Sequence, residues 1–380
     1  MSTFKKICIA LSVLLVVVVC GGVGYMIFHN PDPYTTKAAP QLPNPPLKEL
    51  AERRGIQVGS FASLKYLRER AYTDILASEF EYAIIDGEPN WRFEDHTLRP
   101  SKDRFDFKDM DAVFDFADQN DMPVRVQHML WGDDKWLPEW LTKGNFSRAE
   151  LLDIIHTHIK TLGTRYKGKV REYTVVNEAF SRELETGGNK DWWGKQLGRE
   201  YIDNAFIWAR EADPNAVLIL NDFGNETEGD ISNLMYEYIK DAKSRGIPID
   251  AIGMQMHISS VNNPSTEKVV SNMRRFADLG LNVYITEFDV NMHDSKGSDK
   301  EKERRQAEIY ADMLKACLQV GPKTCPNFGF LGLVDRQSWY NGIGLDDADP
   351  LLFRSDYTPK QAFFAVRETL QDYKPTSRSR

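Results

Sequence analysis

Residues 170–177 read Val-Arg-Glu-Tyr-Thr-Val-Val-Asn, and Glu178 follows them directly. β-Branched and aromatic residues dominate this run, which favours a β-strand. The run does not alternate strictly between apolar and polar residues, and Val175 and Val176 are adjacent, a pattern typical of a parallel strand that is covered on both faces. The stretch therefore predicts a buried parallel strand that ends in polar residues.

Seven further runs of this kind occur along the chain, and charged amphipathic segments that predict helices separate them. The eight runs are 56–62, 82–86, 123–131, 170–177, 216–221, 251–257, 282–287 and 328–334. The clearest helical segments are 199–213, 231–246 and 300–320. Alternating strands and helices over residues 47–373 predict a single (β/α)₈ TIM barrel in the α/β class.

The composition is that of an ordinary folded protein and excludes several other classes of protein. The chain has 380 residues, of which 42% are hydrophobic and 27% charged, so wholesale disorder is excluded. A doubly wound nucleotide-binding sheet is the rival fold, but no G-x-G-x-x-G follows the first predicted strand. The net charge of −8 disfavours nucleic acid as a partner, because phosphate backbones require a basic surface.

The N-terminus predicts a membrane segment. Lys5 and Lys6 precede an uncharged run over residues 7–28, which is longer than the roughly 20 residues that cross a bilayer. We expect residues 1–28 to form an uncleaved signal anchor with its lysines in the cytoplasm and the remaining chain exported. A cleaved signal peptide and a lipoprotein attached through Cys20 stay open as alternatives.

Residues 29–46 are rich in proline and predict an extended linker between membrane and barrel. At the other end, residues 374–380 predict a basic, disordered tail. Two of the four cysteines, Cys317 and Cys325, lie in the part that we expect to be exported. There they form either a disulfide or two buried thiols.

Chemistry in a barrel of this type occurs at the C-terminal ends of the strands. Polar residues close or directly follow four of the predicted strands. They are Asn177 with Glu178, Asn221 with Asp222, Gln255 with His257, and Glu287 with Asp289. Burial removes water from a carboxylate at such a position. This costs free energy, so the group is expected to be paired or to take part in a reaction.

Two glutamates across a barrel mouth suit cleavage of a glycosidic bond. One carboxyl group protonates the leaving oxygen, and the other attacks the anomeric carbon or activates water. Asn177 is placed to donate to a sugar 2-hydroxyl group. We expect His257 to orient Glu287, and Asp289 to fix the tautomer of that histidine.

Other hydrolytic chemistries lack their sequence patterns. None of the seven histidines lies in an H-E-x-x-H motif, and His156 and His158 do not share a helix face. A serine hydrolase would need a G-x-S-x-G turn, which is absent from the sequence. We therefore expect neither a metal nor a cofactor.

Several motifs resemble those of glycoside hydrolase family 10, the endo-β-1,4-xylanases. Residues 173–179, Tyr-Thr-Val-Val-Asn-Glu-Ala, are similar to its W-D-x-V-N-E-A signature. Residues 285–289 resemble its I-T-E-L-D motif, 253–257 its G-x-Q-x-H and 221–223 its N-D-Y. The resemblance runs from about residue 47 to 373 with the motifs in the family's order.

The resemblance implies a retaining double displacement on a xylan-like β-glycan. Glu178 would be the acid/base and Glu287 the nucleophile, supported by His257 and Asp289. The implied substrate-binding residues are Asn177, Asn221, Gln255, Trp131, Trp339, Trp91, Asp86, Asn90 and Gln127. It also implies a disulfide between Cys317 and Cys325, and we expect a monomer.

The residues expected to bind the glycone sugars depart from the family pattern. Residues 86–91 read Asp-Gly-Glu-Pro-Asn-Trp where the family has E-N-x-M-K-W. Gln127 stands where a histidine is expected, with His128 beside it, and Leu331 replaces a tryptophan. These changes predict a retained reaction with an altered substrate preference, such as a different β-glycan. A non-catalytic or very slow carbohydrate-binding protein on the same barrel is the alternative.

Overall fold

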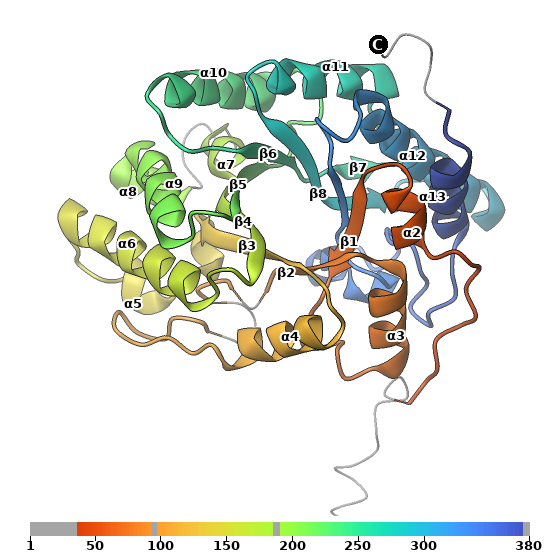
Figure 1. Cartoon of the computed structure of the whole chain (residues 1–380), viewed down its shortest axis with the longest axis horizontal. Helices are drawn as coiled ribbons and strands as arrows, with labels where there is room; N and C mark the ends of the chain where they lie inside the picture. The colour runs from red at the N-terminus through yellow and green to blue at the C-terminus, as the bar shows by residue number, and fades with distance from the viewer. Residues whose placement is uncertain (1–35, 88, 93–96, 185–190, 375–380) are drawn as a thin grey trace, which may run out of the picture.

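The computed structural model describes residues 36–87, 89–92, 97–184 and 191–374. Its centre is a ring of eight parallel strands, in the order β1–β6, β8 and β9, with β9 pairing back to β1 (Figure 1). The ring consists of β1 (Gln57–Phe61), β2 (Tyr82–Ile85), β3 (Val124–Trp131), β4 (Val170–Asn177), β5 (Val217–Asp222), β6 (Ala251–Met254), β8 (Asn282–Asn291) and β9 (Asn327–Phe330). The predicted (β/α)₈ barrel is confirmed.

Helices surround this ring in chain order (Figure 1). The α-helices are α2 (Leu47–Glu52), α3 (Arg70–Glu79), α4 (Lys108–Gln119), α5 (Glu139–Thr142), α6 (Arg148–Arg165), α7 (Ala179–Leu184), α8 (Trp192–Leu197), α9 (Glu200–Ala212), α10 (Asp230–Ser244), α11 (Thr266–Ala277), α12 (Asp299–Val320) and α13 (Gln361–Asp372). Short 3₁₀ helices are η1 (Asp134–Trp136), η2 (Asp335–Gln337) and η3 (Trp339–Ile343).

Helix α11 illustrates why these segments fold as they do. Val269, Met273 and Phe276 recur at helical spacing and are buried, while the opposite face is charged. Ser265 begins the helix by accepting a hydrogen bond from the backbone N–H of Lys268. Burial of each large apolar side chain stabilises the fold by roughly 1.5–3 kcal/mol.

The barrel interior contains a charged pair below the strand ends. Arg125 Nε donates to Glu172 Oε2 at 2.7 Å, and both side chains are buried. The Arg125 guanidinium also lies over the rings of Tyr82 and Tyr284, 5.0 and 5.3 Å from their centroids. Arg125 precedes Gln127 by two positions on β3, so the pair lies one layer beneath the candidate site.

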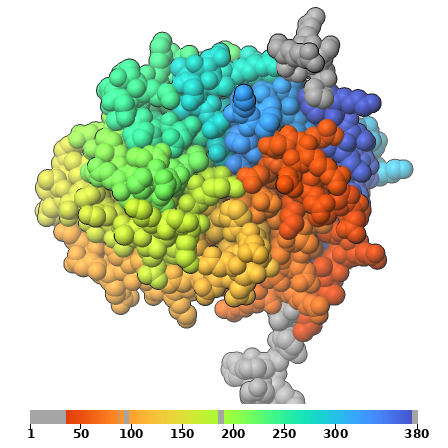
Figure 2. Space-filling model, in the orientation of Figure 1, coloured from red at the N-terminus to blue at the C-terminus, as the bar shows by residue number. Residues whose placement is uncertain are grey.

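The first and last described segments lie side by side. Helices α2 and α13 are in contact and lie side by side in Figure 1, and the red and blue ends of the described chain adjoin in Figure 2. Arg367 on α13 donates to the backbone oxygens of Asn44 and Pro45, while Ala39 and Leu42 pack against the core. Residues 36–46, the part of the predicted linker that the structure describes, therefore contact the barrel, while the linker over residues 29–46 stays a prediction.

Three predicted strands differ from the structure by more than one residue at an end. The run 251–257 is split into β6 and the short β7 (His257–Ser259), because Met256 has a left-handed backbone with φ of 63°. Strand β8 continues past Glu287 to Asn291, since β7 pairs with its last three residues. Strand β9 ends at Phe330, four residues earlier than predicted.

Cys317 at the end of α12 forms a disulfide with Cys325, just before β9. The predicted signal anchor, residues 1–28, lies outside the described residues, as do residues 375–380 of the predicted tail. Within the described ranges, no helix combines the length and the apolar character that a membrane crossing requires.

Candidate active site

Glu178 and Glu287 reach the same end of the barrel from β4 and β8. Each side chain is largely buried, with 7% of the residue exposed. Glu178 follows the last residue of β4 and has a positive φ of 57°, which turns the chain sharply into α7. Its backbone N–H donates to the Asn221 carbonyl at 2.9 Å, which ties the turn to β5.

Asp222 at the end of β5 fixes the start of α7. Its Oδ2 accepts hydrogen bonds from the backbone N–H groups of Phe180 and Ser181 at 2.9 and 3.2 Å. Complete burial raises the pKa of Asp222 to about 7, although the hydrogen bonds with Ser181 and Phe180 oppose this rise. The carboxyl group caps the helix that carries the residues following Glu178.

Among the residues that the structure describes, three side chains donate to the Glu178 carboxylate. Trp131 Nε1 and Arg182 Nε both donate to Oε2 at 2.8 Å, and Gln255 Nε2 donates to Oε1 at 3.1 Å. These donors come from β3, α7 and the break after β6. The carboxylate orientation therefore depends on three elements that are distant in sequence.

The Glu287 carboxylate is held by a second set of donors. Gln127 Nε2 and Asn221 Nδ2 donate to Oε1 at 2.6 and 2.8 Å. His257 Nε2 lies 3.4 Å from Oε2. The β8–β9 register shifts between Ile285 and Phe288, the stretch that contains Glu287. The contacts with Gln127, Asn221 and His257 hold the Glu287 side chain at the barrel mouth.

Asn177 connects the two carboxylates. Its side-chain oxygen accepts from Asn221 Nδ2 at 2.8 Å and from Gln255 Nε2 at 3.2 Å. Those amides are the same ones that bond Glu287 and Glu178. With its oxygen engaged on both sides, the Asn177 amide is oriented with its N–H₂ group as the free donor within the described part of the chain.

Gly253 makes room for this network. A Cβ added at position 253 would lie 2.0 Å from Asn221 Oδ1, well inside the closest observed contacts. Asn221 would then have to move away from Glu287. A glycine on β6 is thus a steric requirement for the amide that orients the Glu287 carboxylate.

His257 lies between two buried carboxylates. Its Nε2 faces Glu287, and its Nδ1 lies 3.2 Å from Asp289 Oδ1. Burial opposes its protonation, but the charges of Asp289 and Glu287 raise the pKa of His257 well above its ordinary value. Trp339 Nε1 donates to Asp289 Oδ2 at 3.1 Å and keeps that carboxylate in place.

The charge state of Glu287 follows from these contacts. Burial alone would raise the pKa of Glu287. Interactions with His128 and His257 outweigh burial and lower this pKa to about 2. Glu287 is therefore ionised at neutral pH, as an attacking carboxylate must be.

His128 belongs to the site together with Gln127. Its Nε2 is 4.0 Å from Glu287 Oε1 and 3.9 Å from Asp86 Oδ1, and its Nδ1 is 3.4 Å from Asn90 Oδ1. The β3–β4 register shifts between Gln127 and Leu130. This bulge breaks the strand alternation, so both side chains reach the mouth.

The predicted tryptophans are not equivalent in the structure. Trp339 is 44% exposed, and Trp131 is partly exposed beside Trp136, so both present ring surface at the mouth. Trp91 is only 2% exposed, stacks on His158 at 4.2 Å and donates to the Met129 carbonyl. The ring of Trp91 therefore packs within the hydrophobic core and not at the mouth, and its role in substrate binding stays a prediction.

Sequence reasoning missed Arg182 and left His128 outside the predicted set of substrate-binding residues. Arg182 follows Glu178 by four residues, and the i, i+4 spacing on a helix was the available signal. His128 follows Gln127 directly, but strand alternation predicts that neighbouring residues face opposite sides. Only the bulge reverses that expectation.

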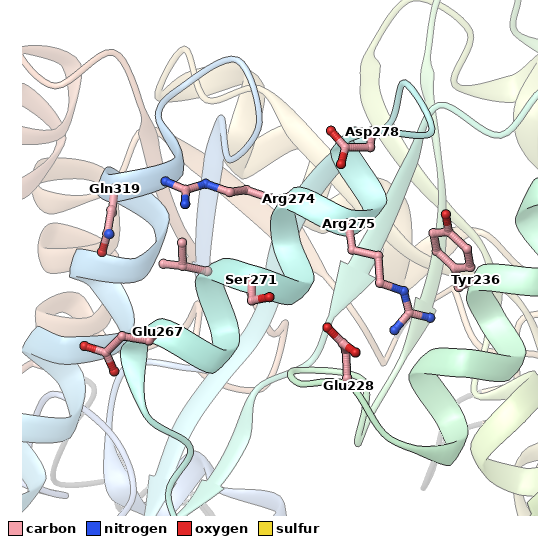
Figure 3. A pocket seen from close by; sticks show the side chains of 9 residues that line it. Glu228, Tyr236, Glu267, Ser271, Arg274, Arg275, Asp278 and Gln319 are labelled. Atoms are coloured by element: carbon pink, nitrogen blue, oxygen red, sulfur yellow. The ribbon is translucent and has the colours of Figure 1, made fainter. Parts of the chain in front are cut away.

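A separate hollow lies on the outside of the barrel. It has a volume of about 480 Å³ and is lined by residues of α10, α11 and α12 together with Glu228 and Asp278 (Figure 3). The Arg275 guanidinium lies over Tyr236 there, 4.3 Å from its centroid. None of the lining residues belongs to the strand-end cluster. In the described ranges, no three His, Cys, Asp or Glu side chains are grouped to hold a metal ion.

Comparison with known proteins identifies the family to which this chain is similar. Residues 46–369 match the model of glycosyl hydrolase family 10. Endo-1,4-beta-xylanase B of Thermotoga neapolitana is 35% identical over 333 residues, which cover 86% of this chain and 92% of that protein. The beta-1,4-xylanase of Dictyoglomus thermophilum is 30% identical over 315 residues, covering 80% and 86%.

Solved structures agree with these sequence relatives. Xylanase 10B from Thermotoga petrophila RKU-1, in complex with xylobiose, is 34% identical with a TM-score of 0.79, covering 87% of this chain and 99% of that chain. Native xylanase 10B from Thermotoga maritima is 35% identical with a TM-score of 0.78, covering 86% and 98%. With its barrel and both glutamates in the matched region, this chain belongs to glycosyl hydrolase family 10.

Proposed function

We propose that this protein is a retaining endo-β-1,4-xylanase that hydrolyses internal bonds of xylan. The observation that carries the proposal is that two buried carboxylates at one barrel mouth have different surroundings. Glu287 is held ionised beside His257, whereas Glu178 lies at the start of α7 within reach of donors from three elements. One group suits attack on carbon, and the other suits proton transfer.

In the first step, Glu287 attacks the anomeric carbon and forms a glycosyl ester. The bond from that carbon to the glycosidic oxygen breaks, and Glu178 gives its proton to the departing oxygen. The Asn177 amide donates to the 2-hydroxyl group of the sugar, an interaction that strengthens as positive charge develops at the anomeric carbon.

In the second step, water replaces the departed sugar. Glu178, now ionised, takes one proton from this water, and the water oxygen attacks the anomeric carbon. The ester bond to Glu287 breaks, which releases a sugar with its original configuration and restores both carboxyl groups. His257 and Asp289 keep Glu287 oriented and charged before attack and after release.

The glycone side is proposed to prefer a substrate that differs from short linear xylo-oligosaccharides. Asp86, Asn90 and Gln127 gather around His128 and Glu287, and Asn90 has a shorter side chain than the lysine of the family pattern. Leu331 is 8% exposed and packs with Phe61, so it offers no indole surface to a sugar. We expect substituted xylans or another β-glycan to fit better, because the shorter Asn90 side chain and the missing indole leave more room beside the glycone sugars.

The full chain is proposed to act outside the cytoplasm as a membrane-anchored monomer, with residues 1–28 as the anchor and residues 47–373 as the catalytic unit. The uncharged run 7–28 after two lysines supports this topology. After a high-salt wash, the full-length protein should remain with membranes. Recovery of a mature chain that begins near Cys20 or within residues 29–46 would contradict an uncleaved anchor.

A panel of polysaccharides tests the activity itself. We expect hydrolysis of xylan, and NMR spectroscopy of the first product should show a retained β-anomer. An inverted first product would contradict the double displacement. Binding of xylan without hydrolysis would instead support the carbohydrate-binding alternative.

A further inference from the structure

The loop that follows β9 carries Trp339 to the barrel mouth and then returns to begin α13. Trp339 lies in η3, where its indole stacks on Tyr340 with ring centroids 4.1 Å apart and approaches His257 at 5.4 Å. Its Nε1 donates to Asp289 Oδ2 at 3.1 Å. Since 44% of Trp339 is exposed, core packing does not enclose its ring, and the ring position depends on the path of the loop.

A buried ion pair joins the two ends of this loop. Lys360 Nζ lies 3.0 and 3.1 Å from Asp335 Oδ1 and Oδ2, and the two residues are 4% and 6% exposed. Asp335 Oδ1 also accepts from the backbone N–H of Leu351 at 2.9 Å. Lys360 Nζ also donates to the Asp349 carbonyl at 2.6 Å. The pair thus bonds the outgoing part of the loop, which begins at η2, to its returning part just before α13.

Asp335 also shapes the turn that precedes Trp339. Its backbone carbonyl accepts from the Ser338 backbone N–H at 3.1 Å and from Asn341 Nδ2 at 3.2 Å. These bonds join η2 to η3, and Trp339 is the first residue of η3. A shift of Asp335 would therefore move the start of the helix that carries the indole.

The returning part of the loop is bonded to the end of β8. The Val290 backbone N–H donates to the Pro350 carbonyl at 3.2 Å. The N–H of Met292, just after the strand, donates to the Ala348 carbonyl at 2.8 Å. Because β8 also carries Glu287, the ion pair connects the Trp339 turn to the strand of the proposed nucleophile.

We propose that Lys360 is a positioning residue for substrate binding, whose ion pair with Asp335 fixes the loop over residues 335–351 and so places the Trp339 ring against the sugar. The inference rests on the proposed glycanase function and deepens it, because it assigns part of the substrate affinity to a buried residue behind the mouth. The pair makes directed hydrogen bonds to two backbone groups on the returning part of the loop. An apolar pair of similar volume would lack those bonds.

The test is steady-state kinetics of the full-length protein and its Lys360→Met variant on soluble xylan, at a temperature where both are folded. KM should rise roughly twofold to tenfold, the range expected when one aromatic contact is lost. kcat should fall by less than about twofold, since Asp289 keeps its contact with His257 when the indole moves. Partial unfolding would instead lower kcat and leave KM in place.

Combination with Trp339→Ala shows whether Lys360 acts through the indole. Trp339→Ala alone should raise KM at least as much as Lys360→Met does. In the Trp339→Ala background, Lys360→Met should raise KM no further, although it should still lower stability in urea.

A paired replacement separates loop position from stability. Lys360→Met alone leaves Asp335 buried without its cation, which is strongly destabilising. Asp335→Leu combined with Lys360→Met removes both charges and should recover much of the lost stability. KM should stay raised in this double variant, because neither replacement bonds the returning part of the loop. The double variant also carries the test if Lys360→Met does not fold.

Arg210→Met is the matched control at the other end of the barrel. Arg210 pairs with Asp250 and donates to the carbonyls of Pro214 and Ala216. Asp250 Oδ2 also accepts from the Leu218 backbone N–H at 2.8 Å. This cation and carboxylate bond backbone groups in the same manner, but at the N-terminal ends of β5 and β6. The variant should lose stability and keep the wild-type KM.

A folded Lys360→Met protein with the wild-type KM would overturn the proposal. Recovery of the wild-type KM in the paired apolar variant would also overturn it, as would an undiminished Lys360→Met effect in the Trp339→Ala background. An equal rise in KM for Arg210→Met would show a general effect of destabilisation and overturn it too. A wild-type protein without glycosidase activity would instead refute the proposed function itself, and the dissociation constant of xylotetraose would then replace KM in the same comparisons.

Discussion

His257 Nε2 lies 3.4 Å from Glu287 Oε2, so an imidazole contacts the carboxylate that we propose as the nucleophile. Asp289 on the other side of the ring keeps the imidazole protonated, because its charge raises the pKa of His257 against the effect of burial. The result is a buried row of alternating charge from Asp289 to Glu287. Such a row maintains an ionised glutamate in a place where burial alone would neutralise it.

His257→Asn should move the acid limb of kcat/KM to higher pH. The wild-type contacts lower the pKa of Glu287 to about 2, so activity is lost only as the pH falls toward that value. Asparagine removes the positive charge, and the pKa of Glu287 should then rise toward its ordinary value of 4.5. His156→Asn is the matched control, because that ring lies against Trp208 away from the site. An acid limb that stays in place would show that His128 and the amide donors suffice.

Glu287→Ala and Glu178→Ala should fail in different ways. Without Glu287 no glycosyl ester forms, so turnover should be lost on every substrate. Without Glu178, substrates with poor leaving groups should lose most, by roughly 10²–10⁴-fold, while activated aryl glycosides retain the first step. Azide should then partly restore turnover on the aryl substrate. Similar losses of Glu178→Ala on both substrate types would contradict the assignment.

Leu331→Trp combined with Asn90→Lys should raise kcat/KM on linear xylotetraose. The tryptophan would restore a ring surface, and the lysine a donor, that the family pattern has and this chain lacks. Each such contact is worth roughly 1–3 kcal/mol where its partner would otherwise stay unpaired. Steady-state kinetics of wild-type and double-variant proteins on xylotetraose and on a substituted xylan provide the measurement. A wild-type protein already as active on xylotetraose as other family members would show that neighbouring residues replace the missing contacts.

Arg125→Met should destabilise the barrel by about 3 kcal/mol. The change leaves Glu172 buried without its main partner, and breaking such a pair typically costs roughly 3–5 kcal/mol. Arg171 and Asn327 also contact Glu172 at 2.9 Å, which places the expected loss at the lower end. Urea unfolding gives the free energy directly. Arg53→Met breaks an exposed pair with Glu49 and should change stability by less than about 1 kcal/mol.

The barrel was predictable because its elements are encoded locally. Runs rich in β-branched and aromatic residues, such as 170–177, favour strands. Eight such runs in alternation with helical segments leave few folds other than a barrel. Glu178 and Glu287 were likewise recognisable as polar residues within or directly after such runs. These features depend on side-chain chemistry and spacing along the chain.

The tertiary structure decided how the candidate site is assembled. Met256 adopts a left-handed backbone that separates β7 from β6, and the bulge on β3 brings both Gln127 and His128 to Glu287. Trp91 is buried in the core because α6 and α8 close over it, with His158 and Trp193 against its ring. Pairing register, bulges and helix placement depend on contacts between segments far apart in sequence, so a local pattern does not specify them.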